Sequence, residues 1–206
     1  MSYLEKFIEA VKYKNELFPN EKSLDIETYK SYSISGNISK RELSDVKEIC
    51  LDCLSEVLCK CDMDLRLGCS LYSELLKECL CSNGYDGNEI SFTVGDVSYR
   101  GKYIYNLNEE KLRCIVEAGR QRDKTLDVHA WITYKSTFVF DSTIKSNVNI
   151  SKDRNNVEDN LLSWDENNKQ EFDYLPLLVD NNFYFRVDEF EEQFIAWRRS
   201  PFGLSF

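Results

Sequence analysis

The spacing of the apolar residues changes near Gly84, and this change limits the possible folds more than any other feature of the sequence. Before Gly84 the apolar residues recur every three or four positions, which is the spacing of one face of an α-helix. After it, Ile90, Phe92 and Val94 alternate with small or polar residues, as in a half-buried strand. Helices followed by an antiparallel sheet are typical of the α+β class, which we therefore predict.

The first half of the chain is predicted to contain three amphipathic helices. The first covers residues 3–18. A polar linker separates it from a second helix, which begins at a capping box formed by Ser39 and Glu42. The third is expected to begin near Gly68 and to stop before Gly84, with leucines on its buried face. These helices are expected to pack on the sheet.

The second half is predicted to form that sheet. β-Branched and aromatic residues at 97–105, 127–134 and 137–144 favour strands, and a short turn joins the last two. Residues 109–118 are ambiguous, and the Asn- and Asp-rich stretch at 145–171 is expected to be loop. The elements expected after it are strands at 175–179 and 183–187 and a terminal helix capped by Asp188.

The length of 206 residues fits a single compact domain covering 1–206. Within this domain we expect a helical part at 1–65 and a central core at 66–144. The last part, at 145–206, would supply loop, strands and the terminal helix.

Charge and hydropathy limit the partners and the location. The chain has 36 acidic and 26 basic side chains, and a net charge of −10 repels phosphate backbones, so no nucleic-acid partner is expected. No window approaches the roughly 18 uncharged apolar residues of a transmembrane helix, and the first residues lack a signal-peptide layout. We therefore expect no membrane partner and a cytoplasmic location, with delivery as an effector left open. The oligomeric state is not indicated.

One of the eight cysteines occupies a position that favours reactivity. Without a signal peptide, reduced thiols are expected. The thiolate is the reactive form, and the positive end of a helix lowers the pKa of a cysteine placed there. Cys69 is the only cysteine predicted at such an end, beside Gly68. The alternative is that Cys69 is a small apolar residue of the core, as most free cysteines are.

A thiolate nucleophile works best with an imidazole that shares its proton, and the chain has a single histidine, His129. Strand alternation places His129, Trp131 and Thr133 on one face. Asp141 is the nearest carboxylate that could orient the ring. A lone strand histidine is more often structural, and Asp141 could instead cap its own turn.

The hairpin register decides how His129 meets Asp141. With a three-residue turn, the residue numbers of two directly opposite residues would add up to 270, and His129 would face Asp141. With a two- or four-residue turn, the sum would be 271 and Ser142 would face His129, with Asp141 a near neighbour. The turn contains no Gly or Asn, so the sequence leaves the register open.

These residues resemble the core of a known family, the transglutaminase-like branch of the papain-fold cysteine enzymes. The resemblance covers residues 66–144 and follows the order Cys, His, Asp. The segments that carry it are Gly68-Cys69-Ser70 at a helix start, Asp127-Val128-His129-Ala130-Trp131 on a strand and Phe140-Asp141-Ser142-Thr143 on the next strand. It implies a papain-like fold, with Cys69 as nucleophile, His129 as general base and acid, and Asp141 as the residue that orients His129.

The resemblance further implies an enzyme that cleaves or rearranges amide bonds of a peptide or protein through a thioester. Peptidases, deamidases and transglutaminases all occur in this superfamily, and fold likeness does not choose among them. No cofactor is implied. Two departures stand out: no glutamine precedes Cys69 to hold the oxyanion, so backbone amides, Tyr99 or Tyr103 would have to serve, and Ser142 stands where many relatives have proline.

Two other functions compete with this one. Cys50, Cys53, Cys79 and Cys81 have spacings found in zinc proteins, although the first two lie on an apolar helix face where buried thiols are expected. Alternatively, the chain is an inactive binding or scaffold protein that keeps the same core. Trp131 and the tyrosines of 99–105 could line a groove, but such strand aromatics usually pack in the core.

Overall fold

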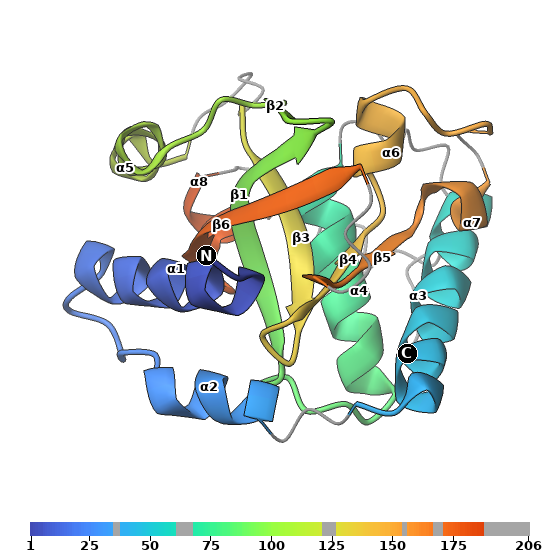
Figure 1. The fold of residues 1–206 in the computed structure, drawn as a ribbon, viewed down its shortest axis with the longest axis horizontal. Helices are drawn as coiled ribbons and strands as arrows, with labels where there is room; N and C mark the ends of the chain where they lie inside the picture. Colours follow the sequence, from blue (N-terminus) through green and yellow to red (C-terminus); the bar gives the residue numbers. More distant parts are fainter. Residues whose placement is uncertain (35–37, 61–67, 121–126, 154–155, 167–170, 188–206) are drawn as a thin grey trace.

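The computed structural model describes residues 1–34, 38–60, 68–120, 127–153, 156–166 and 171–187. In these residues the chain forms eight helices and an antiparallel sheet of six strands, which confirms the α+β class (Figure 1). The helices are α1 (Tyr3–Leu17), α2 (Ile26–Ile34), α3 (Lys40–Lys60), α4 (Cys69–Ser82), α5 (Glu109–Ala118), α6 (Ile144–Asn147), α7 (Val157–Asn160) and α8 (Phe183–Val187). The strands are β1 (Ile90–Tyr99), β2 (Lys102–Tyr103), β3 (His129–Tyr134), β4 (Phe138–Asp141), β5 (Leu162–Trp164) and β6 (Phe172–Val179).

The long strand β1 is the centre of the sheet. It pairs with β3 and β2 and with β6, and β4 and β5 continue beyond β3. The sheet curls, so that β5 at one end of the strand order lies close to β6, which pairs with β1. The indole Nε1 of Trp164 on β5 donates to the carbonyl oxygen of Phe172 on β6 at 3.2 Å.

Gly95 permits the tightest approach in this sheet. It lies where the register of β1 and β6 shifts, opposite His129 on β3. A Cβ atom at Gly95 would overlap the carbonyl oxygen of Leu175 and lie 2.8 Å from the Trp131 ring. Only glycine fits here without moving backbone, so this position fixes how β6 and Trp131 pack beside His129.

Helices cover the sheet on two sides, as the amphipathic patterns predict. In Figure 1, α1 crosses in front of the sheet and α4 lies behind it. One core cluster joins α3 and α4 to side chains such as Ile132 and Tyr134, and another joins α1 to Trp131 and Tyr174. The predicted alternation along β3 is thus observed.

The helix boundaries follow the predicted caps, with one difference. The Ser39 hydroxyl accepts a hydrogen bond from the Glu42 amide at 3.0 Å, as expected for the start of α3. The Glu42 carboxylate, however, accepts from the Tyr134 hydroxyl and the Lys135 ammonium group at 2.6 and 2.7 Å. Only half of the predicted capping box is therefore present, and the Glu42 side chain instead links α3 to the turn between β3 and β4.

Three segments differ from the predictions. The expected polar linker contains α2, whose first turn is stabilised by bonds from the Glu27 amide and the Thr28 hydroxyl to the Asp25 carboxylate. The segment 183–187 is helix α8 and not a strand, because Phe183, Tyr184 and Val187 are buried at helical spacing. The expected loop at 145–171 includes α6, α7 and β5, and the ambiguous 109–118 is α5.

The predicted hairpin register is wrong in both of its versions. Ile132 pairs with Phe140, so paired positions sum to 272. The turn residues Lys135 and Ser136 have positive φ values of 46° and 60°. Contacts outside the hairpin hold them: the Ser136 hydroxyl donates to the Tyr29 carbonyl at 2.9 Å, and the Lys135 amide donates to the Glu89 carbonyl at 2.8 Å. Tertiary contacts therefore set the register.

The predicted terminal helix, with its capping residue Asp188, lies outside the described residues. None of the helices in the described ranges is long and apolar enough to cross a membrane.

We predict that Gly95→Ala destabilises the protein by about 3 kcal/mol, because overpacking of this size forces backbone movement. Gly87→Ala is the matched control, since its Cβ would meet only the Cys81 thiol at 3.2 Å. Urea unfolding followed by circular dichroism measures both. Equal stability of the two variants would show that β6 and Trp131 do not press on Gly95.

Candidate active site

Cys69 is the first residue of α4, as the sequence predicts. Gly68 is the N-cap and contributes no side-chain hydrogen bond, so the amides of the first turn point outward from the helix start. The half-buried Cys69 thiol lies 3.9 Å from the Val128 carbonyl oxygen and 4.0 Å from the Ser70 hydroxyl. Val128 directly precedes β3, so α4 brings the sulfur to the start of that strand.

The glycine at position 68 is explained by the space beside it and not by a sharp turn of the backbone. Its φ of −120° is open to any residue. A Cβ atom at Gly68 would, however, lie 2.6 Å from the ring of Tyr72, one turn into α4. The glycine therefore lets the buried Tyr72 ring pack directly under the residue that precedes Cys69.

His129 and Asp141 form a buried hydrogen-bonded pair. The Nε2 of His129 lies 2.5 Å from Oδ2 of Asp141, and the two side chains are 0% and 1% exposed. A carboxylate can only accept, so Nε2 carries a proton. With the observed register, Asp141 is the diagonal neighbour of His129 and not the residue directly opposite. The predicted contact is present although the predicted register is wrong.

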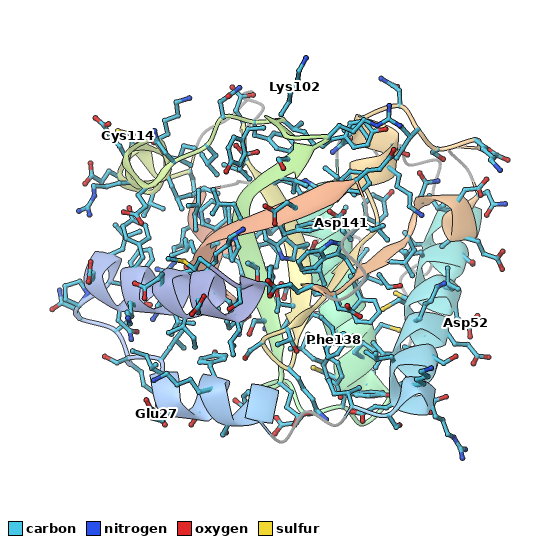
Figure 2. All side chains as sticks on the ribbon, in the orientation of Figure 1. Glu27, Asp52, Lys102, Cys114, Phe138 and Asp141 are labelled. Atoms are coloured by element: carbon cyan, nitrogen blue, oxygen red, sulfur yellow. The ribbon has the colours of Figure 1, made fainter. Side chains whose placement is uncertain are left out.

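Asp141 performs both roles that the sequence left open. Its Oδ1 accepts from the amides of Thr143 and Ile144 at 2.9 and 3.1 Å, which caps α6. Its Oδ2 accepts from His129 and from the Tyr174 hydroxyl, the latter at 2.9 Å. Figure 2 shows Asp141 in the middle of the molecule. The capping bonds fix one oxygen, and the other oxygen therefore points at the imidazole.

The pKa shifts of these three groups favour separated charges. Burial acts to raise the pKa of the Cys69 thiol, but the hydrogen bond and charge of His129 outweigh it, and the pKa is lowered. For His129, burial opposes the charged form, yet Asp141 and Cys69 outweigh burial and raise the pKa well above its usual range. Burial likewise opposes the Asp141 carboxylate, whose pKa is lowered chiefly by His129. A thiolate, an imidazolium and a carboxylate are the consistent set.

Tyr105 contacts this pair and Asn147 in turn holds Tyr105, and sequence reasoning missed the roles of both. The ring of Tyr105 stacks on the imidazole with centroids 5.2 Å apart and 7° between planes, and its hydroxyl lies 3.3 Å from Nδ1 of His129. The Asn147 amide donates to that hydroxyl at 2.8 Å. Tyr105 falls in the aromatic segment noted above, whereas Asn147 has no sequence signal.

The tyrosines proposed from the sequence lie elsewhere. Tyr103 is 53% exposed, and the Tyr99 ring packs on Phe172 with its centroid 5.1 Å away. Trp131 is fully buried and donates to the Tyr3 hydroxyl at 3.0 Å, so it belongs to the core and does not line a groove. Tyr174, on β6, is the aromatic residue that touches Asp141.

The arrangement of the four cysteines bears on the zinc alternative. Cys50, Cys53 and Cys79 are buried in the core between α3 and α4, whereas Cys81 is exposed. In the described part of the chain, no group of three or more His, Cys, Asp or Glu side chains is placed to hold a metal ion.

Comparisons with protein-family models, with curated proteins and with solved structures found no match for this chain. A thiol at a helix start, beside an imidazole fixed by a buried carboxylate, can form a nucleophile at neutral pH.

We predict that His129→Gln moves the midpoint for alkylation of Cys69 by iodoacetamide above the free-thiol value of about 8.5. The variant removes the group that lowers the thiol pKa and leaves burial, which raises it. Wild type should show a midpoint below that value. Peptide mapping by mass spectrometry reports each site separately, and the exposed Cys114 serves as the internal reference. A midpoint that is unchanged in the variant would mean that His129 does not control this thiol.

Proposed function

We propose that this protein is a cysteine-dependent enzyme of papain-like, transglutaminase-like architecture that hydrolyses an amide bond of a peptide or protein or transfers its acyl group. The observation that carries this proposal is the buried bond from His129 Nε2 to Asp141 Oδ2 at 2.5 Å, with Cys69 at the neighbouring start of α4. It leaves Nδ1 as the ring atom able to exchange a proton with the thiol. The sequence resemblance supplies the reaction class.

In the proposed reaction the Cys69 proton resides on His129, and the thiolate attacks the carbonyl carbon of the substrate. The carbonyl π electrons move to the oxygen, which the amides at the start of α4 stabilise. When the carbonyl re-forms, the amine leaves with the C–N bonding pair and takes the proton from Nδ1. Water or a second amine then resolves the thioester and releases Cys69.

Asp141 contributes by restricting the imidazole. Its remaining bonds to Thr143, Ile144 and Tyr174 prevent it from turning away. The imidazolium that forms is stabilised by the adjacent carboxylate, as in the general logic of a catalytic triad. Asp141 accepts no proton in this scheme.

One observation favours the alternative of an inactive binding protein. His129 is wholly buried, and Tyr105 lies over its Nδ1. In the proposed reaction the substrate carbonyl approaches the partly exposed Cys69 thiol, and the leaving amine must come within reach of Nδ1 of His129 for the thioester to form. Reactivity of the thiol toward an acyl donor decides between the two functions.

We predict that wild type, after incubation with a mixture of defined peptides, produces a mass change that Cys69→Ala does not. Cleavage, a one-dalton gain and a crosslink identify a peptidase, a deamidase and a transglutaminase respectively. Cys114→Ala, which removes an exposed thiol on α5, is the matched control and should behave as wild type. If the Cys69 thiol alkylates no faster than Cys114 and no peptide changes mass, the chain is not an enzyme of this class.

A further inference from the structure

The O–H proton of Tyr105 has no acceptor among the two groups that contact its hydroxyl. The hydroxyl oxygen accepts from Asn147 Nδ2 at 2.8 Å and lies 3.3 Å from Nδ1 of His129. When His129 is an imidazolium, both ring nitrogens are donors. Neither the protonated Nδ1 nor the Asn147 amide nitrogen can then accept from Tyr105, so its O–H proton is directed to neither neighbour.

The Tyr105 proton stays on its oxygen at every pH relevant to catalysis. Burial, followed by the charges of Cys69 and Asp141, raises the pKa of the Tyr105 hydroxyl far above its ordinary value. Cys69 and Tyr105 also pack against the same core cluster, which includes Val128 and Ala130 of the β3 segment. Tyr105 is therefore a permanent hydrogen-bond donor beside the nucleophile.

Both ends of Tyr105 are held in place. The buried Asp96 accepts from the backbone amides of Tyr105 and Leu107 at 3.1 and 2.9 Å, which fixes the segment. Asn147 holds the hydroxyl, and the ring is stacked on the imidazole. A donor that is fixed before the reaction needs no reorganisation when charge develops, which is the condition for effective transition-state stabilisation.

We propose that the Tyr105 hydroxyl is the side-chain donor to the oxyanion that forms when Cys69 attacks a carbonyl group, together with the backbone amide of Cys69. This inference rests on the proposed function. A sulfur lone pair forms the C–S bond, and the carbonyl π pair becomes the charge on oxygen that the two donors bind. On collapse the carbonyl re-forms and the leaving group departs with its bonding pair. Tyr105 thereby takes the place of the missing glutamine.

Two probes separate this role from an effect on the thiol. p-Nitrophenyl acetate acylates a thiolate through an oxyanion and releases p-nitrophenolate, whereas iodoacetamide alkylates it by substitution at carbon and forms no oxyanion. Tyr105→Phe keeps the stacked ring and removes only the hydroxyl. We expect acylation of Cys69 to slow about 10²- to 10³-fold, the range for loss of one oxyanion donor, and alkylation to change by less than about threefold.

Tyr103→Phe is the matched control, because this tyrosine of the same segment is largely exposed and should leave both rates unchanged. If circular dichroism shows that Tyr105→Phe does not fold, Asn147→Ala is the second variant. It removes the bond that holds the Tyr105 hydroxyl and should slow acylation of Cys69 about tenfold. Equal loss of both reactions in Tyr105→Phe, or loss of neither, overturns the role of Tyr105. Wild-type Cys69 that reacts with either probe no faster than Cys114 overturns the proposed function, and this inference with it.

Discussion

The hydrogen bond between His129 and Asp141 is the interaction on which the rest of the site depends. Both groups are buried, and a buried charge without a partner is strongly unfavourable. Each makes the other's charged form acceptable: the carboxylate raises the pKa of the imidazole, and the imidazolium lowers that of the carboxylate. The remaining bonds of Asp141 come from β6 and from the start of α6, so several separate elements must be folded before this pair can form.

The architecture explains how such a pair can be tolerated in the core. Polar groups on the sheet are linked to one another and to α1: the Thr93 and Thr133 hydroxyls lie 2.8 Å apart, and the Tyr3 hydroxyl of α1 lies 2.7 Å from that of Thr133. Gly95 allows β6 to approach β1 closely, and β6 carries Tyr174 to Asp141. Helix α4 lies behind β3 and delivers Cys69 to the end of the strand at which His129 begins. The site thus lies where the start of the interior strand β3 meets the start of α4.

The sequence predicts those parts that local spacing determines. Cys69 at the start of α4 and the face shared by His129 and Trp131 follow from periodicity and strand alternation. The hairpin register does not follow, because Ser136 and Lys135 are held by partners far away in the sequence. Tyr174 could not be assigned for the same reason, since its contact with Asp141 depends on the order of strands in the sheet. Tyr105 lies in the aromatic segment 99–105, but local spacing does not give its position, which depends on the bond from its amide to the buried Asp96.

Because the chain has a single histidine, its imidazole can be observed without assignment ambiguity. The most direct test of the charge-separated site is a titration of the two His129 ring nitrogens by ¹⁵N NMR between pH 5 and 10. The structure predicts that both nitrogens remain protonated at pH 7.5, because Asp141 and Cys69 stabilise the imidazolium and raise its pKa well above the ordinary imidazole value of about 6.5. A ring that is neutral at pH 7.5 and titrates near 6.5 would contradict the charged arrangement of Cys69, His129 and Asp141.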